Sequence, residues 1–335
     1  MIESMRHIGS VLLDKFRREP SVIKQYYHNG DSHRAHPGWN VFMIDGKMNH
    51  GGMFDRLKGA ITVYALSKAQ GREFKLLFTF PFNLQNYLTP NDYDWAVSSE
   101  DICYCFPDSV PIIAYGEYRH PARLMKTRRM ETHYYYGFDS LNYVNKKYGT
   151  TYEWGSLYSE LFKPTPRLQH YIDHYVTEIG AEYVAVHLRL MNLLGDKVET
   201  VGENLTLDHD AQLRLIKACS DRIQKIKTEN DGKRIMLCSD SNIFVNHMLS
   251  LMPDLFVIPG EVKHIDTAGR TDDSQNIKLF LDYYLIAGAQ KVYSIYGTPE
   301  QNYADEEHVP CGLYPSAFPK YAAKIGCKPF ERIRL

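Results

Sequence analysis

The chain has few of the features that mark secreted or membrane-spanning proteins. Its six cysteines are scattered irregularly through 335 residues, which does not match a disulfide framework. Cys103 and Cys105 have no second pair at ligand spacing, which argues against a zinc site. No apolar run is long enough to span a bilayer or to form the core of a signal peptide. These absences favour a cytoplasmic protein with reduced thiols.

An excess of charge of one sign is also missing. The chain has 39 lysines and arginines against 40 acidic residues, a formal net charge of −1, which argues against a dedicated nucleic-acid-binding protein. The dinucleotide fingerprint Gly-x-Gly-x-x-Gly is absent, which argues against NAD binding. One segment is locally basic, with cations at Arg119, Arg123, Lys126, Arg128 and Arg129. As a helix it would present a cationic face, either a solvated surface or a peripheral contact with a membrane or a phosphorylated acceptor.

The spacing of apolar residues predicts alternating strands and helices. In the first half, a strand at 39–44, a glycine-bearing loop at 45–52, a helix from about Phe54 and a strand at 74–80 form a β-loop-α-β unit. Residues 81–165 are less regular and are expected to complete a first domain with long surface loops. In the second half we expect helices at 166–179, at 208–228, at 274–288, starting near 241, and after Thr298. The strands expected between them are 183–190, 234–238, 255–258 and 291–295.

Such an alternation is typical of α/β proteins with parallel sheets. The two X-Pro pairs in segment 163–167 favour extended backbone and mark a domain boundary. We therefore predict an α/β protein with two Rossmann-like domains, residues 1–165 and 166–335, that face each other across a cleft.

Segment 182–190 is the most informative part of the chain. Its sequence, EYVAVHLRL, has no charge between Glu182 and Arg189, and it reads as a strand buried in a parallel sheet. The strand ends on His187 and Arg189, and the C-terminal edge of such a sheet is where α/β proteins bind ligands. A guanidinium at this edge suits a phosphate because it donates two charge-assisted hydrogen bonds at once. The alternative is a capping salt bridge.

Three further segments place polar groups at strand ends or loops. Segment 239–241 (SDS) follows the strand 234–238, where Ser239 or Asp240 either meets a ligand or caps the next helix. Segment 294–298 (SIYGT) either cradles an anion or caps a helix. Segment 49–56 (NHGGMFDR) carries two glycines that allow a ligand to approach the backbone closely.

Taken in order, these segments resemble the superfamily of fucosyltransferases that use GDP-fucose on a two-Rossmann (GT-B) fold. That group includes α1,2- and α1,6-fucosyltransferases, rhizobial nodulation enzymes and protein O-fucosyltransferases. Residues 51–59 (GGMFDRLKG) look like its glycine loop and helix, and 184–189 (VAVHLR) like its first motif. Residues 236–240 (MLCSD) resemble the second motif, and 281–298 the third. The sequence departs from the family at Leu190 and Asn192, where a second arginine and an aspartate are common, and at Ser241, where a second acid is common.

The resemblance implies a metal-independent, inverting glycosyltransferase that moves fucose from GDP-fucose to a glycan hydroxyl. Arg189 would stabilise the leaving diphosphate, and Asp240 and Asp282 would contact the nucleoside or orient the arginine. Tyr296, Gly297 and Thr298 would hold the pyrophosphate. The full set of implied donor-binding residues is His187, Gly51, Gly52, Ser239, Asp240, Asp282, Ser294, Tyr296, Gly297 and Thr298.

The general base has two candidates, each with an ordinary alternative. Asp196 lies just past the Arg189 strand but is also a plausible loop acid, and Asp55 follows the glycine loop but could pair with Arg56 or a lysine. The pairs Asp92/Asp94 and Asp208/Asp210 match the Asp-x-Asp metal motif of another glycosyltransferase class. The first pair does not follow a strand and the second is expected to open a helix, where acids suit the dipole. We therefore expect no metal cofactor.

The resemblance also assigns partners. Residues 1–165 would be the acceptor-side domain, and residues 166–335 would bind the nucleotide sugar. The acceptor would be a glycan or glycolipid of the cell surface, reached from the cytoplasm or from the inner face of the membrane. Two alternatives stay open: a GT-B transferase with another nucleotide sugar, and a non-catalytic relative that binds a glycan or nucleotide.

Overall fold

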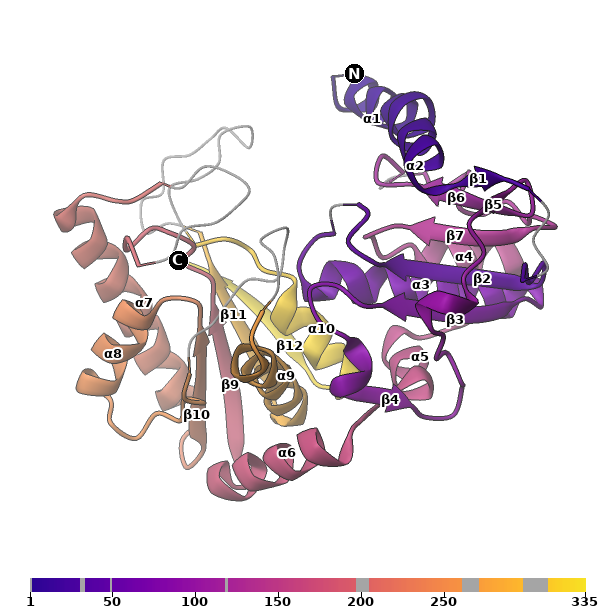
Figure 1. Ribbon diagram of the computed structural model, residues 1–335. Coiled ribbons are helices and arrows are strands. Elements are labelled where there is room, and N and C mark those ends of the chain that lie inside the picture. Colours follow the sequence, from indigo (N-terminus) through magenta and orange to yellow (C-terminus); the bar gives the residue numbers. More distant parts are fainter. Residues whose placement is uncertain are drawn as a thin grey trace. The chain divides into compact units, whose positions relative to one another are not determined.

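The computed structural model describes residues 2–30, 34–48, 50–117, 120–196, 205–260, 271–297 and 313–335. They divide into two compact units, unit 1 (Met1–Thr165) and unit 2 (Pro166–Leu335). Each unit contains a four-stranded parallel sheet with helices packed against it (Figure 1). The predicted α/β fold class is confirmed. The functional roles assigned to 1–165 and 166–335 stay predictions.

The sheet of unit 1 has the strand order β3-β2-β7-β6. The predicted β-loop-α-β unit is present as β2 (Trp39–Ile44), α3 (Met53–Gln70) and β3 (Glu73–Phe78). Helix α3 ends at Gly71, whose φ of 63° is the left-handed conformation that glycine adopts without strain. The other elements of unit 1 are α1 (Ile2–Leu13), the π-helix η1 (Asp14–Arg18), α2 (Glu19–Tyr26), β1 (His28–Asn29), η2 (Leu84–Asn86), β4 (Leu88–Pro90), η3 (Ser99–Asp101), β5 (Cys105–Phe106), β6 (Ser109–Ile113), β7 (Glu131–Tyr135), α4 (Leu141–Tyr148), α5 (Trp154–Leu161) and β8 (Phe162–Pro164).

Strands β6 and β7 lie in the region that the sequence pattern left irregular. All five residues of β7 are buried, including Glu131 and His133. Their polar groups are satisfied inside the core, since His133 Nε2 lies 2.8 Å from Glu131 Oε1 and its Nδ1 lies 2.5 Å from the hydroxyl of Tyr27. Because buried positions of β7 carry polar side chains, its sequence does not alternate between apolar and polar residues. The spacing of apolar residues therefore did not predict this strand.

The basic segment 119–129 is not a helix, so the predicted cationic helical face is wrong. Arg119 lies outside the described residues, and 122–125 form a turn. Arg123 makes an ion pair with Glu19, and its Nε lies 3.7 Å from Glu117 Oε1. This guanidinium is therefore used inside unit 1.

The sheet of unit 2 has the strand order β10-β9-β11-β12. Its elements are α6 (Pro166–Ile179), β9 (Tyr183–Leu188), α7 (His209–Glu229), β10 (Arg234–Ser239), α8 (Asn242–Leu251), α9 (Asp273–Gly288), β11 (Val292–Tyr296), α10 (Phe318–Ile325) and β12 (Phe330–Arg334). Most of them match the predicted ranges closely. The predicted strand 255–258 is wrong, because only Phe256 forms a β-bridge, with Met236. Helix α10 and strand β12 were not predicted, and the helix expected after Thr298 lies outside the described residues.

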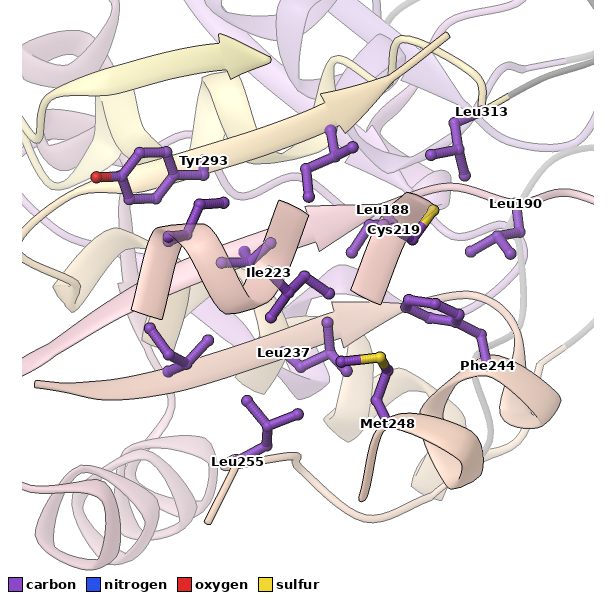
Figure 2. Packing of buried hydrophobic residues seen from close by; sticks show 14 of the residues in the cluster. Leu188, Leu190, Cys219, Ile223, Leu237, Phe244, Met248, Leu255, Tyr293 and Leu313 are labelled. Carbon is purple, nitrogen blue, oxygen red and sulfur yellow. The ribbon is translucent and has the colours of Figure 1, made fainter. Parts of the chain in front are cut away.

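One face of this sheet packs on α7 and α8. Figure 2 shows Leu188 and Leu237 of the sheet beside Cys219 and Ile223 of α7 and Phe244 of α8, all in one hydrophobic cluster. Because successive side chains of a strand point to opposite faces, the residues between these apolar ones face the other side of the sheet. His187 is one of them.

Candidate functional site

Three neighbouring strands of unit 2 bring polar side chains into one row. In the sheet register His187 of β9 lies between Cys238 of β10 and Ser294 of β11. Paired residues of adjacent parallel strands point to the same face, so these three side chains share the face opposite the α7–α8 core. Arg189 and Asp240 follow directly at the carboxyl edge of β9 and β10. The structure thus brings together four of the predicted site residues: His187, Arg189, Asp240 and Ser294.

The carboxylate of Asp240 organises the turn that follows Arg189. Its two oxygens accept hydrogen bonds from the backbone N–H groups of Leu190 (2.7 Å) and Met191 (3.1 Å). Met191 has a φ of 55°, which side-chain-bearing residues rarely adopt. Successive amides directed at one anion form a nest, and the carboxylate holds this conformation in place.

Arg189 lies between an acid and an aromatic ring. Its Nε is 4.0 Å from Asp240 Oδ2, and its guanidinium carbon is 4.9 Å from the centre of the Tyr314 ring. The backbone is fixed as well, since the N–H of Tyr314 donates to the carbonyl of Arg189 (3.0 Å). The arginine side chain is 19% exposed, so a restrained cation remains accessible at the sheet edge. Tyr314 was not predicted, because nothing nearby in the sequence links it to β9.

His187 and Ser294 lie on the same face of the sheet as Arg189, on the adjacent strands β9 and β11. The imidazole of His187 is buried and stacks on Phe318 of α10, with ring centres 5.6 Å apart and planes at 25°. The hydroxyl oxygen of Ser294 is buried and has no hydrogen-bond partner among the described residues. A buried hydroxyl without a partner is costly, and a ligand oxygen would satisfy it.

The start of α8 resolves the alternatives for segment 239–241. The N-cap is Ser241, whose hydroxyl accepts from the N–H of Phe244 (3.1 Å). Ser239 Oγ accepts from the N–H of Ser241 (3.3 Å), while Asp240 faces the β9 turn and does not cap. Asp196, a predicted base, accepts from Ser241 Oγ and from the N–H of Ile243, both at 2.9 Å. Its contacts are those of a second cap on α8.

Asp282 lies next to the row, since the Cys238 thiol of β10 bonds to its carboxylate, but it is buried. It is 4% exposed and lies on α9, where Lys278 Nζ donates to its carboxylate at 3.1 Å and to the carbonyl of Ile258 at 2.9 Å. Burial raises the pKa of Asp282, and the charge of Lys278 opposes that rise. Burial also raises the pKa of the Cys238 thiol, which bonds to the same carboxylate. These contacts favour a structural role for Asp282 over direct contact with a ligand.

The turn after β11 is held by backbone pairing. Gly297 has a φ of 90° and exchanges both backbone hydrogen bonds with Leu313, at 3.0 and 2.9 Å. Its N–H is therefore used within unit 2, and the pyrophosphate role of Gly297 stays a prediction. Tyr296 is half-buried, with the guanidinium of Arg332 5.7 Å from its ring centre. Thr298 lies outside the described residues.

In unit 1 the glycine loop is shaped by Arg56. This arginine is buried, and it donates from Nε to the carbonyl of Gly51 (2.8 Å) and from Nη1 to the carbonyl of Phe80 (2.6 Å). A Cβ on Gly51 would lie 2.8 Å from Asp55 Cβ, so a larger residue there would have to displace the start of α3. Gly52 is the N-cap residue of α3. Asp55 pairs with Lys58 at 2.5 Å yet remains 45% exposed.

His50 was missed, although it precedes the two glycines. It is buried, its Nδ1 lies 3.4 Å from the Tyr115 hydroxyl, and its ring stacks on Tyr135. Burial, reinforced by the charge of Arg56, lowers the pKa of His50 to about 3. The imidazole is therefore neutral at physiological pH.

Within the described part of the chain, no three or more His, Cys, Asp or Glu side chains gather in a group that could hold a metal ion. None of its helices combines the length and the apolar character needed to cross a bilayer.

Comparison with known proteins identifies the fold. No protein-family model and no curated protein sequence matches the chain. Among solved structures, the fucosyltransferase NodZ from Bradyrhizobium matches with a TM-score of 0.51 and 15% identity, over 85% of this chain and 91% of that one. A variant of Arabidopsis thaliana FUT1 in complex with GDP matches with a TM-score of 0.54 and 9% identity, over 99% of this chain and 78% of that one. The chain therefore has the GT-B fold seen in fucosyltransferases.

Proposed function

We propose that this protein is a glycosyltransferase that transfers fucose from GDP-fucose to a hydroxyl of a glycan or glycolipid. The observation that carries the proposal is Arg189, a restrained and partly exposed cation at the carboxyl edge of the unit 2 sheet, on the face where the hydroxyl of Ser294 has no hydrogen-bond partner among the described residues. Two proteins of similar fold, FUT1 and an α-1,6-fucosyltransferase NodZ, have been solved with GDP. A diphosphate is the anion that such an arginine suits best.

The chemistry follows from where charge develops. As the glycosidic C–O bond breaks, negative charge grows on the leaving β-phosphate oxygen and the sugar becomes oxocarbenium-like. Arg189 would stabilise this oxygen, with Tyr314 and Asp240 keeping the guanidinium in place before the reaction starts. The acceptor hydroxyl would attack from the opposite face of the sugar, which inverts the anomeric configuration. Arginine and hydroxyl groups would supply this stabilisation without a metal ion.

For the general base we propose Asp55 in preference to Asp196. A general base needs one oxygen that can reach the acceptor hydroxyl. One oxygen of Asp196 is bonded by Ser241 and Ile243 at the start of α8 and the other is buried, whereas Asp55 pairs with Lys58 through one oxygen and its side chain is 45% exposed. His187 and Ser294 would line the donor pocket. Gly51 would let the loop before α3 pack closely on Asp55.

The identity of the donor depends on two positions next to Arg189. Leu190 is buried in the hydrophobic cluster, and Asn192 donates from Nδ2 to Thr206 Oγ1 (2.9 Å). Leu190 does not supply the second cation, and Asn192 does not supply the acid, that the resemblance would lead one to expect. A nucleotide sugar other than GDP-fucose is therefore the alternative that the test must separate.

The test is calorimetric binding of GDP, UDP and CMP to the protein in EDTA, followed by turnover of GDP-fucose with glycan acceptors. We expect micromolar binding of GDP alone and its loss in Arg189→Ala, with Arg222→Ala, a partly exposed arginine of α7, as the matched control. Binding of UDP or CMP instead would mean that the donor is a nucleotide sugar other than GDP-fucose. Unchanged turnover in Arg189→Ala would refute the mechanism, and no binding of any nucleotide would favour a non-catalytic relative.

A further inference from the structure

The first helix of unit 1 carries a row of exposed apolar side chains. Ile8, Leu12 and Phe16 are 55%, 48% and 68% exposed. Their spacing of four residues places them along one side of the helix formed by α1 and η1. Single exposed apolar residues are common on protein surfaces, but a contiguous row marks an interaction surface.

The opposite side of this helix is fixed to unit 1. Asp14 is fully buried and accepts a hydrogen bond from the N–H of Gly116. Glu19 makes an ion pair with Arg123, and Val22 belongs to a hydrophobic cluster on the unit 1 sheet. Since these contacts fix the side facing the unit, the apolar row is held toward solvent.

The exposed surface around the row is positively charged. Residues 8–25 contain four cations (Lys15, Arg17, Arg18 and Lys24) and two acids (Asp14 and Glu19). Both acids are used in the contacts that fix the helix, so they do not face outward. The whole chain has a formal charge of −1, which makes this local excess distinctive. Two copies of the surface would repel each other, whereas an anionic surface would be attracted.

A groove adjoins the same helix. It has a volume of about 350 Å³, and its lining includes three cations, Arg17, Arg18 and Lys47, together with the polar side chains of Ser21 and Gln25. Arg18 is held in place by Asp14, whose Oδ1 lies 2.6 Å from Arg18 Nη1.

Lys47 also lines this groove and is held in position. Its Nζ is 3.0 Å from Asp45 Oδ2 and 3.9 Å from the centre of the Tyr104 ring. Its side chain is 24% exposed, and the 4% exposed carboxylate of Asp45 offsets part of its charge. A phosphate group fits such a site, because charge-assisted hydrogen bonds from several cations can converge on its oxygens.

We infer that unit 1 docks on an anionic phospholipid surface through the helix at residues 8–25. The row Ile8–Leu12–Phe16 enters the boundary between headgroups and acyl chains, and Lys15, Arg17 and Lys24 meet the lipid phosphates. The groove lined by Arg17, Arg18 and Lys47 takes one headgroup phosphate. We propose this surface as the membrane contact in place of the basic segment 119–129, because Arg123 of that segment is used inside unit 1. The inference does not depend on the proposed transferase activity.

The test is flotation of the full chain with phosphatidylcholine vesicles, with and without phosphatidylglycerol. We expect binding only when the anionic lipid is present, with weakening by salt. The double variant Leu12→Gln/Phe16→Gln should lose it, while Leu251→Gln, which changes a 58% exposed leucine on α8, should not. Each of Arg17→Gln and Lys24→Gln should weaken partitioning about fivefold, and Lys225→Gln on α7 should leave it unchanged.

Several results would overturn the inference. One is vesicle binding that survives the Leu12→Gln/Phe16→Gln change or falls equally in Leu251→Gln. Another is sedimentation that shows a dimer dissociated by the same double variant, with no vesicle binding. A third is capture of an acidic oligosaccharide such as oligogalacturonate in the groove without vesicle binding. Denaturant unfolding of the same samples checks folding, and GDP binding tests the proposed function separately.

Discussion

Asp240 is bonded more tightly to the backbone after Arg189 than to the arginine side chain. Its oxygens lie 2.7 and 3.1 Å from the amides of Leu190 and Met191, whereas Arg189 Nε is 4.0 Å away. The acid therefore positions Arg189 chiefly by fixing the turn in which the arginine lies.

We predict that Asp240→Asn weakens GDP binding about tenfold without removing Arg189. An amide offers one acceptor oxygen, and its NH₂ group faces a backbone N–H that has lost its partner. The unfolding free energy should also fall, by about 1–3 kcal/mol. Calorimetry and denaturant unfolding measure the two effects. GDP binding of parental strength in Asp240→Asn would show that the turn holds without the carboxylate.

The two base candidates are expected to respond differently to amide substitution. Asp196→Ala should lower stability by about 1 kcal/mol, as the loss of a helix cap does, whereas Asp196→Asn keeps one acceptor oxygen and should change stability less, and both should change kcat little. Ser241→Ala should behave in the same way, since it caps the same helix. Asp55→Asn should lower kcat and leave the melting temperature nearly unchanged, because its side chain is exposed. A loss of kcat in Asp196→Asn at unchanged stability would reverse the assignment.

Much of the architecture follows from local sequence. Helix α3 and strands β2, β9 and β10 were predicted because their apolar residues repeat with the period of their element and glycine or polar residues end them. That His187 and Ser294 lie close together could also be predicted from the sequence, because parallel strands have their carboxyl ends at one edge of the sheet. Strand β7 could not be predicted, because its polar core residue His133 finds its partner in Tyr27, 106 positions earlier in the chain.

The site differs from expectation where a residue contacts another residue that a short sequence motif does not contain. Gly297 was placed at a pyrophosphate by resemblance, but its amide pairs with Leu313. Tyr314, which packs on Arg189, lies 125 positions away from it in the chain. For Asp282 a local signal existed: Lys278 lies four residues earlier on the same helix, a spacing that favours an ion pair. Only the structure shows that this pair is buried.

That buried pair leads to a third prediction. Lys278→Met should destabilise the protein by about 3–5 kcal/mol, because the Asp282 carboxylate would be left without its cation. Adding Asp282→Leu should recover much of the loss, since a well-packed apolar pair removes the unpaired charge. Denaturant unfolding of both single variants and the double variant completes the cycle. Additive losses in the double variant would mean that the two side chains do not interact as the structure has them.

The last prediction concerns pH. The pKa of His50 is lowered from 6.5 to about 3 in the folded chain, so between these values the unfolded chain binds a proton that the folded chain does not. The stability associated with the neutral imidazole is complete above pH 6.5 and is lost as the pH falls, at about 1.4 kcal/mol per pH unit. His50→Phe removes this term. The parental protein should therefore lose stability relative to His50→Phe between pH 6 and pH 4. Denaturant unfolding at several pH values measures the difference, and parallel curves would mean that His50 titrates normally in the folded protein.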